Sequence, residues 1–91
     1  MTLKVALVTS VGHDPNGVDI SRVILDKEIQ VCSTTNSRVT LKTKDIYVTM
    51  ITNDLMDKIS INEGAFYLDT SGYIIDVHKS ESGNRAWMIK K

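Results

Sequence analysis

The alternation of hydrophobic and polar residues along this chain is typical of β-strands, whose successive side chains point to opposite faces of a sheet. Residues 3–10 form the first such run, with apolar residues on both faces, which favours a central strand or one that is covered on both sides. A dense turn signal, GHDPNG, follows at 12–17, where Pro15 and the Asn16-Gly17 pair favour a tight reversal. Residues 85–91 form the last run, with Trp87 and Ile89 on one face and Ala86 and Met88 on the other.

The clearest predicted hairpin spans 64–77, GAFYLDTSGYIIDV. The segment 69–72 separates two β-prone runs, and its Asp and Gly residues are those that such a loop favours. A four-residue loop pairs the two runs so that one face of the hairpin is apolar. That register places Leu68 opposite Tyr73 and Phe66 opposite Ile75, and it leaves Tyr67, Ile74 and Asp76 on the outer face.

Two further segments are expected to be β-structure. Residues 18–33 fit either two strands that divide near 26–28 or a helix with Asp19 as its N-cap, and their β-branched residues favour strands. A polar link at 33–37 leads into a second predicted hairpin at 38–52, with its turn at Thr43-Lys44. Because neither turn residue suits a tight hairpin, a longer loop is an alternative there.

Residues 53–59, NDLMDKI, have helical spacing instead. Asn53 is a suitable cap, and Leu55, Met56 and Ile59 fit one short apolar face. Residues 79–84 are expected to form a flexible loop before the last strand. The sum is a mainly β fold, a small antiparallel barrel or sandwich of about seven short strands with one short helix near residues 53–59.

Composition narrows the class of protein. The 91 residues are expected to form one globular domain, 1–91, and the formal net charge is zero, so no overall field attracts nucleic acid or an anionic membrane. The single cysteine, Cys32, precludes an internal disulfide; it indicates a reducing, cytoplasmic setting, and we expect its thiol to be buried. No apolar run reaches the length of a membrane span. Abundant Ile, Val, Thr, Lys and Asn suggest an AT-rich genome, such as that of a virus or mobile element.

The residue patterns predict neither an enzyme nor a cofactor or metal site. His13-Asp14 lacks the three or four converging ligands that a metal needs, and residues 14–19 lack the spacing and terminal glutamate of a calcium loop. Cys32 has no basic neighbour that would activate its thiolate. There is no nucleophile elbow and no glycine-rich phosphate loop. We therefore expect a non-enzymatic protein without a cofactor, in which 12–17 is simply a turn.

Local charge points to two kinds of binding function. Residues 38–44 carry three basic residues and no acid, whereas residues 53–76 carry five acidic residues and one lysine. Basic residues around an aromatic ring can hold a nucleic-acid backbone while the ring stacks on a base. The predicted nucleic-acid-binding residues are Arg38, Lys42, Lys44, Tyr47 and Trp87, which Lys79, Arg85, Lys90 and Lys91 extend.

The acidic segment favours a protein partner. Carboxylates around apolar anchors can bind a basic protein, and the free edges of a small β-domain can pair with a partner's strand. Our first expectation is a protein-binding module, an inhibitor or adaptor that occludes its partner's surface. The alternatives are a single-stranded nucleic-acid-binding β-barrel and a small-molecule-binding or self-assembling β-domain, with homo-oligomers possible through free sheet edges. The predicted partner-binding residues are Asp54, Asp57, Tyr67, Ile74 and Asp76.

Overall fold

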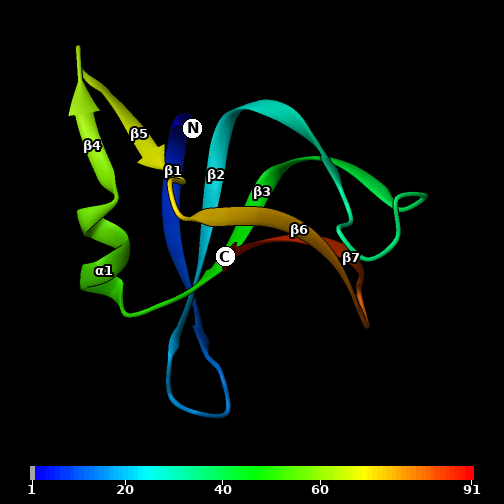
Figure 1. Ribbon diagram of the computed structural model, residues 1–91. Coiled ribbons are helices and arrows are strands. Elements are labelled where there is room, and N and C mark those ends of the chain that lie inside the picture. Colours follow the sequence, from blue (N-terminus) through cyan, green and yellow to red (C-terminus); the bar gives the residue numbers. More distant parts are fainter. Residues whose placement is uncertain (1) are drawn as a thin grey trace.

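The computed structural model describes residues 2–91, which form seven strands and one short helix (Figure 1). The strands make one sheet in the order β4-β5-β1-β2-β3-β7-β6. The prediction of a mainly β protein with about seven strands and one short helix is confirmed. The elements are β1 (Thr2–His13), β2 (Asp19–Cys32), β3 (Thr40–Thr49), α1 (Thr52–Asp57), β4 (Ile59–Asn62), β5 (Ala65–Asp69), β6 (Tyr73–Ser80) and β7 (Gly83–Lys90).

The sheet is mainly antiparallel and strongly curled. Strands β1, β2 and β3 form a meander, and β3 and β7 are the one parallel pair in the described chain. The sheet curls so that β6 passes in front of β2 and β3, and β6 touches β2 (Figure 1). The sheet does not close, so β4 and β6 remain its two edges.

Irregular pairing explains the curl. In β1, Ala6 and Val11 lie at register shifts against β2. In β2, the four residues 25–28 lie opposite only Lys44 of β3, because Ile24 pairs with Asp45 and Ile29 with Thr43. Such bulges bend a strand and increase its twist. The expectation of strands over 18–33 is confirmed, and the predicted division near 26–28 is the bulge inside one long strand.

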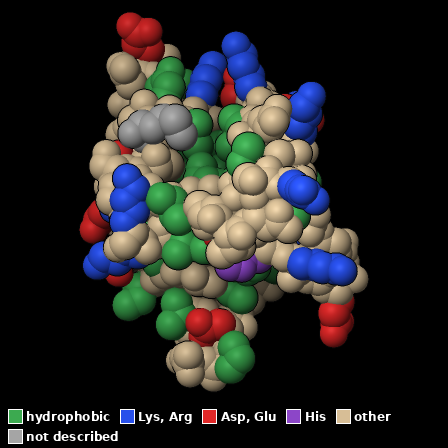
Figure 2. Space-filling model, turned by 45° about the vertical axis from the view of Figure 1, so that its right-hand side comes forward, with side chains coloured by type: hydrophobic (Ala, Val, Ile, Leu, Met, Phe, Trp, Pro, Cys, Tyr) green, Lys and Arg blue, Asp and Glu red, His purple; other side chains and the backbone are tan. Residues whose placement is uncertain are grey.

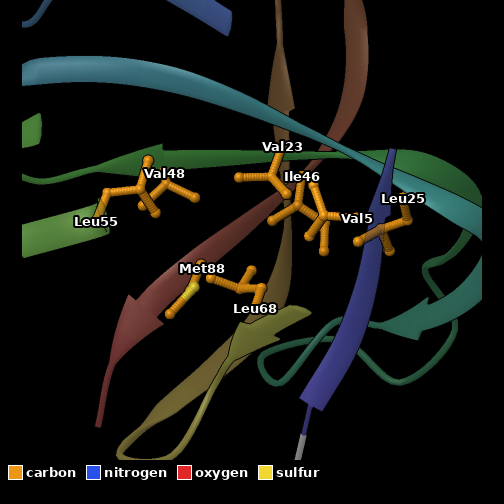
Figure 3. Close-up of a cluster of buried hydrophobic side chains, with 8 residues drawn as sticks. All are labelled: Val5, Val23, Leu25, Ile46, Val48, Leu55, Leu68 and Met88. Atoms are coloured by element: carbon orange, nitrogen blue, oxygen red, sulfur yellow. The ribbon is translucent and has the colours of Figure 1, made fainter. Parts of the chain in front are cut away.

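The core lies inside the curl, where inward-facing residues of the strands meet the helix (Figure 3). Alternate residues of β2, β3 and β7 are buried, as side-chain alternation requires. Leu55 of α1 is fully buried, so this short helix is anchored by packing and not by its own length. The cluster comprises Val5, Val23, Leu25, Ile46, Val48, Leu55, Leu68 and Met88.

The predicted hairpin at 64–77 is wrong, although its turn is present. The Tyr73 amide donates to the Thr70 carbonyl, and Gly72 has a φ of 81°, as a tight turn requires. The two flanking strands then diverge, since β5 pairs with β1 and β4 while β6 pairs with β7. Leu68 therefore lies opposite Leu3 and Ile59, not opposite Tyr73. Both Leu68 and Tyr73 still face the core, which is the part of the pattern that alternation predicts.

The second predicted hairpin, at 38–52, is also wrong, because β3 runs without a turn through Thr43 and Lys44. The flexible loop expected at 79–84 is instead the end of a hairpin, in which Ser80 pairs with Gly83 across a two-residue turn. Two residue-level expectations fail as well. Cys32 is exposed, and the helix begins after Ile51 without a side-chain cap, so Asn53 lies inside it.

Candidate nucleic-acid interface

A row of side chains crosses the outer face of β1, β2, β3 and β7. The strand register pairs Thr9 with Arg22, Arg22 with Tyr47, and Tyr47 with Trp87. Residues that lie directly opposite each other on neighbouring strands share a face of the sheet. The residues adjacent in sequence on β2, β3 and β7 are buried, so the row faces away from the core.

Tyr47 is the centre of this row. The centroids of the Tyr47 and Trp87 rings are 5.1 Å apart, and the ring planes are tilted by 42°. The guanidinium carbon of Arg85 lies 4.7 Å from the Tyr47 centroid, and that of Arg22 lies 5.8 Å from it. Both distances suit cation–π attraction, and 5.1 Å suits an aromatic pair. Both rings are half-buried, so they are held by the sheet and still reach solvent.

The two arginines differ in how much of their charge is available. Arg22 forms an ion pair with Asp45, and the hydrogen bond from Arg22 to Asp45 raises the pKa of the guanidinium above its ordinary value. Arg85 donates a hydrogen bond to the Ser82 hydroxyl and forms no ion pair within residues 2–91. Arg85 is therefore the cation of this cluster that is free to meet an anion.

A small polar cleft of about 180 Å³ adjoins the Tyr47 ring between β3 and β7. Its wall carries the amide side chain of Asn84 beside the cation of Arg85, whereas the Thr43 hydroxyl is hydrogen-bonded to the backbone of Asp45. The site thus combines an aromatic surface, a cation and polar groups within one short stretch of the sheet. The lining residues are Leu41, Thr43, Asp45, Tyr47, Asn84, Arg85 and Ala86.

The structure brings together part of the predicted nucleic-acid-binding set. The rings of Tyr47 and Trp87 are in contact, and Arg85 joins them from the predicted extension. Lys42 and Lys44 are exposed earlier on β3, and Lys42 lies about 16 Å from Tyr47 along the strand, because it stands five positions before Tyr47. Arg38 is exposed in the loop before β3. Sequence reasoning missed Arg22, because its contact with Tyr47 depends on which strand pairs with β2.

The predicted partner-binding residues do not form one surface. Asp54 and Asp57 are exposed on α1, Tyr67 is half-buried on β5, and Ile74 is half-buried on β6. Asp76 is only 5% exposed, so its expected place on an open hairpin face is wrong. The reason is that the hairpin does not form and the loop after β2 folds over Asp76 instead.

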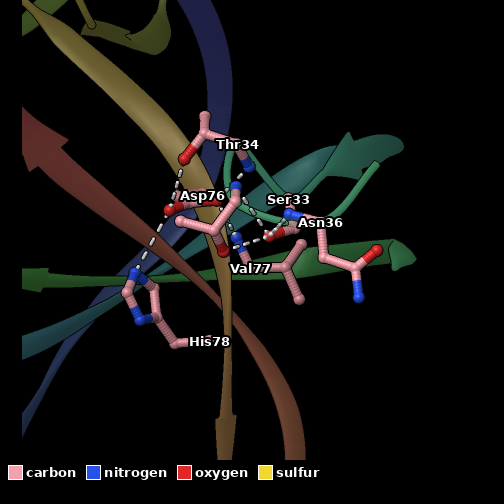
Figure 4. A network of polar contacts seen from close by, with 7 residues as sticks. Ser33, Thr34, Asn36, Asp76, Val77 and His78 are labelled. Atoms are coloured by element: carbon pink, nitrogen blue, oxygen red, sulfur yellow. Dashed lines mark hydrogen bonds and ion pairs between the residues drawn. The ribbon is translucent and has the colours of Figure 1, made fainter. Parts of the chain in front are cut away.

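Asp76 holds that loop against β6 (Figure 4). Its Oδ1 accepts hydrogen bonds from the backbone amides of Thr34 and Val77, at 2.8 and 2.9 Å, and its Oδ2 accepts one from the Thr34 hydroxyl, at 2.9 Å. His78 Nε2 lies 3.3 Å from Oδ2. The bond from the Thr34 amide is the main cause that lowers the pKa of Asp76 below its ordinary value. This carboxylate is committed to internal contacts.

An apolar groove of about 220 Å³ opens between β1, α1, β4 and β5. Leu7, Met56 and Phe66 border it and are themselves exposed. The exposed carboxylates of Asp54 and Asp57 lie on the same helix as Met56. The groove is lined by Val5, Ala6, Leu7, Val8, Met56, Ile59 and Phe66.

A larger hollow of about 580 Å³ lies between the end of β2 and β6. Apolar side chains, among them Ile29, Val31, Tyr73 and Ile75, form much of its wall. Figure 2 shows hydrophobic side chains in the middle of one face of the molecule, with Lys and Arg side chains mainly around its margins. Its volume suits a small molecule, but its polar groups define no ligand chemistry, so small-molecule binding stays a prediction.

Turn chemistry accounts for the segment 12–17. Asp14 Oδ1 accepts hydrogen bonds from the backbone amides of Asn16 and Val18. His13 Nε2 lies 3.1 Å from a carboxylate oxygen of Asp19. Residues 2–91 contain no group of three or more His, Cys, Asp or Glu side chains placed to hold a metal ion. No helix in the same part of the chain is long and apolar enough to cross a membrane.

Comparison of the chain with protein-family models, with curated proteins and with solved structures finds no match.

Proposed function

We propose that this protein binds single-stranded nucleic acid through the outer face of β2, β3 and β7. The observation that carries the proposal is the tilted contact of the Tyr47 and Trp87 rings with the Arg85 guanidinium over the Tyr47 ring. Every base has a π-face, so an aromatic platform binds unpaired bases with little regard to sequence. A guanidinium beside that platform supplies the charge-assisted hydrogen bonds that a phosphate accepts.

The mechanism follows from the order of groups along the row. An unpaired base stacks on the exposed part of the Tyr47–Trp87 pair, and the adjoining phosphate meets Arg85. Asn84 then offers hydrogen bonds to the sugar or the base edge from the cleft beside the ring. In a duplex the base faces are already stacked, so this mode favours single strands. By fold-level analogy only, small, partly open β-barrels use strand faces in this way.

Fluorescence of Trp87, the only tryptophan, tests the proposal in titrations with mixed-sequence single-stranded DNA and RNA at low salt. Removing a stacked ring costs about 1–3 kcal/mol per base, so Tyr47→Ala should weaken binding by about 5- to 150-fold. Arg85→Gln should weaken it as well, whereas Lys27→Gln, which removes one charge from the exposed bulge of β2, should change it little. A gel shift with the same strands must agree. Absence of saturable binding in both assays would reject the proposal.

Protein binding is the second candidate function, and the apolar groove beside α1 favours it. Leu7, Met56 and Phe66 expose apolar surface around a concave site, and Asp54 and Asp57 carry negative charge on the adjoining helix. The partner that fits is a segment with an apolar anchor and flanking basic residues. Such binding would be lost in Met56→Glu and kept in Tyr47→Ala, which separates it from nucleic-acid binding. An inhibitor or adaptor of this kind would act by occluding its partner's surface.

A further inference from the structure

We infer that the free edge of β1 pairs with the same edge of a second copy of this chain, joining the two sheets into one. On one side, β1 pairs with β2 along most of its length, from Val5 to His13. On the other side, β1 pairs with β5 only from Thr2 to Val5. Within residues 2–91, no strand pairs with that second side of β1 from Leu7 to His13.

This edge lacks the charges and prolines that protect many edge strands, although the bulges at Ala6 and Val11 shorten its regular part. Residues 5–12, VALVTSVG, contain no charged residue and no proline, and Leu7 and Val11 are 54% and 51% exposed. Charges, prolines, bulges and short length are the usual defences against pairing with another chain. The other two edges have such defences. Strand β4 is only four residues long. On β6, the Asp76 carboxylate accepts a hydrogen bond from the Val77 amide, and the loop that contains Thr34 covers this part of the edge.

The edge is also self-complementary. In an antiparallel pair with its two-fold axis at Thr9, Leu7 of each copy lies opposite Val11 of the other, and Thr9 lies opposite Thr9. The same patch then serves both copies, which closes the assembly at a dimer. The shifts at Ala6 and Val11 limit regular pairing to a short stretch. Val11 of the second copy comes to Leu7, which borders the apolar groove.

Pairing at this edge would extend the aromatic row. An antiparallel pair keeps the outer faces of the two sheets on the same side, and Thr9 is the β1 member of the row through Arg22 and Tyr47. The two Tyr47 rings would lie five strand spacings apart, about 24 Å. This consequence rests on the proposed nucleic-acid function, whereas the pairing itself does not.

The test is the oligomeric state in the absence of nucleic acid, measured by sedimentation velocity over a range of concentrations. The wild-type chain should show a concentration-dependent dimer. Thr9→Lys and Thr9→Glu should each weaken the dimer about tenfold or more, because like charges then face each other across the axis. An equimolar mixture of the two variants should restore dimerisation as a heterodimer. Thr49→Lys and Thr49→Glu, at an exposed position on an interior strand, are the matched controls and should dimerise like the wild type.

Three results would overturn the inference: a wild-type chain that stays monomeric at its highest soluble concentration, a dimer that the Thr9 variants leave intact, or no recovery on mixing them. Circular dichroism melts identify a variant that fails to fold. Binding of a short single strand to the wild-type chain, at a concentration below its dimer dissociation constant, reports on the aromatic site separately, so the two proposals can fail independently.

Discussion

Asp76 satisfies two backbone amides at the edge of β6, those of Thr34 and Val77. Asparagine has the same shape, but it carries no charge and only one of its two terminal atoms accepts hydrogen bonds. We expect Asp76→Asn to lower the free energy of unfolding by about 1–3 kcal/mol, measured by urea denaturation. Asp26→Asn removes an exposed carboxylate 3.8 Å from Lys4 and should cost less than about 0.5 kcal/mol. Equal losses in both variants would contradict a structural role for Asp76.

The difference in unfolding free energy between wild type and Asp76→Asn should change with pH in a definite direction. Because the pKa of Asp76 is lowered in the folded state, its stabilisation is present above the unfolded pKa of about 4 and is lost as pH falls through the folded value. The stability gap between wild type and Asp76→Asn should therefore stay constant near neutral pH and shrink in acid, below about pH 4. His78 lies beside the carboxylate, so both proteins should carry His78→Gln. A stability difference that grows as the pH falls would contradict this prediction.

At the scale of elements, the β4–β5 turn holds a correctable strain. Glu63 and Gly64 have φ values of 52° and 78°, the pattern of a turn that prefers Asn-Gly. Glu63→Asn should raise the free energy of unfolding by about 0.5–1 kcal/mol, since Asn tolerates positive φ better than Glu. Glu81→Asn, in the two-residue β6–β7 turn, is the control, because Glu81 has no positive φ. Equal gains in the two variants would show that removal of charge, not backbone conformation, is what matters.

The elements themselves were largely predictable from the sequence, and their partners were not. Alternation predicts which residues face inward, and it does so correctly for Leu68 and Tyr73. Alternation carries no information on which strand lies alongside. The turn at 69–72 therefore predicts a hairpin, whereas in the structure Leu68 pairs with Leu3. The helix was found because Leu55 lies at its buried position in a segment without β alternation.

The candidate site is only partly predictable for the same reason, because alternation does not specify strand partners. The sequence marks Tyr47 and Trp87 as aromatic residues with basic neighbours, but the reason they meet is the parallel pairing of β3 with β7. That pairing joins segments 40 positions apart, and no local pattern specifies it. Arg22 reaches the ring through β2 in the same way, so it could not have been named beforehand.

At the scale of the whole molecule, a net charge of zero predicts that stacking, not the overall field, dominates any nucleic-acid affinity. For single strands, log K falls with log salt with a slope of about −0.7 for each neutralised phosphate. With Arg85 free and Arg22 paired to Asp45, few phosphates can be neutralised, so we expect a shallow slope of about −1 to −2.

A salt titration should therefore distinguish the contribution of Arg85 to binding from that of Tyr47. Arg85→Gln should make the slope less steep by about 0.7, because one phosphate contact is lost. Tyr47→Ala should lower the affinity by a similar factor at every salt concentration and leave the slope unchanged, since stacking releases no counterions. Fluorescence titrations of Trp87 at four or more salt concentrations measure both quantities, with Lys27→Gln as the charge-matched control. If Arg85→Gln and Lys27→Gln change the slope equally, the cation over the Tyr47 ring is not the phosphate contact, and binding is diffuse over the surface.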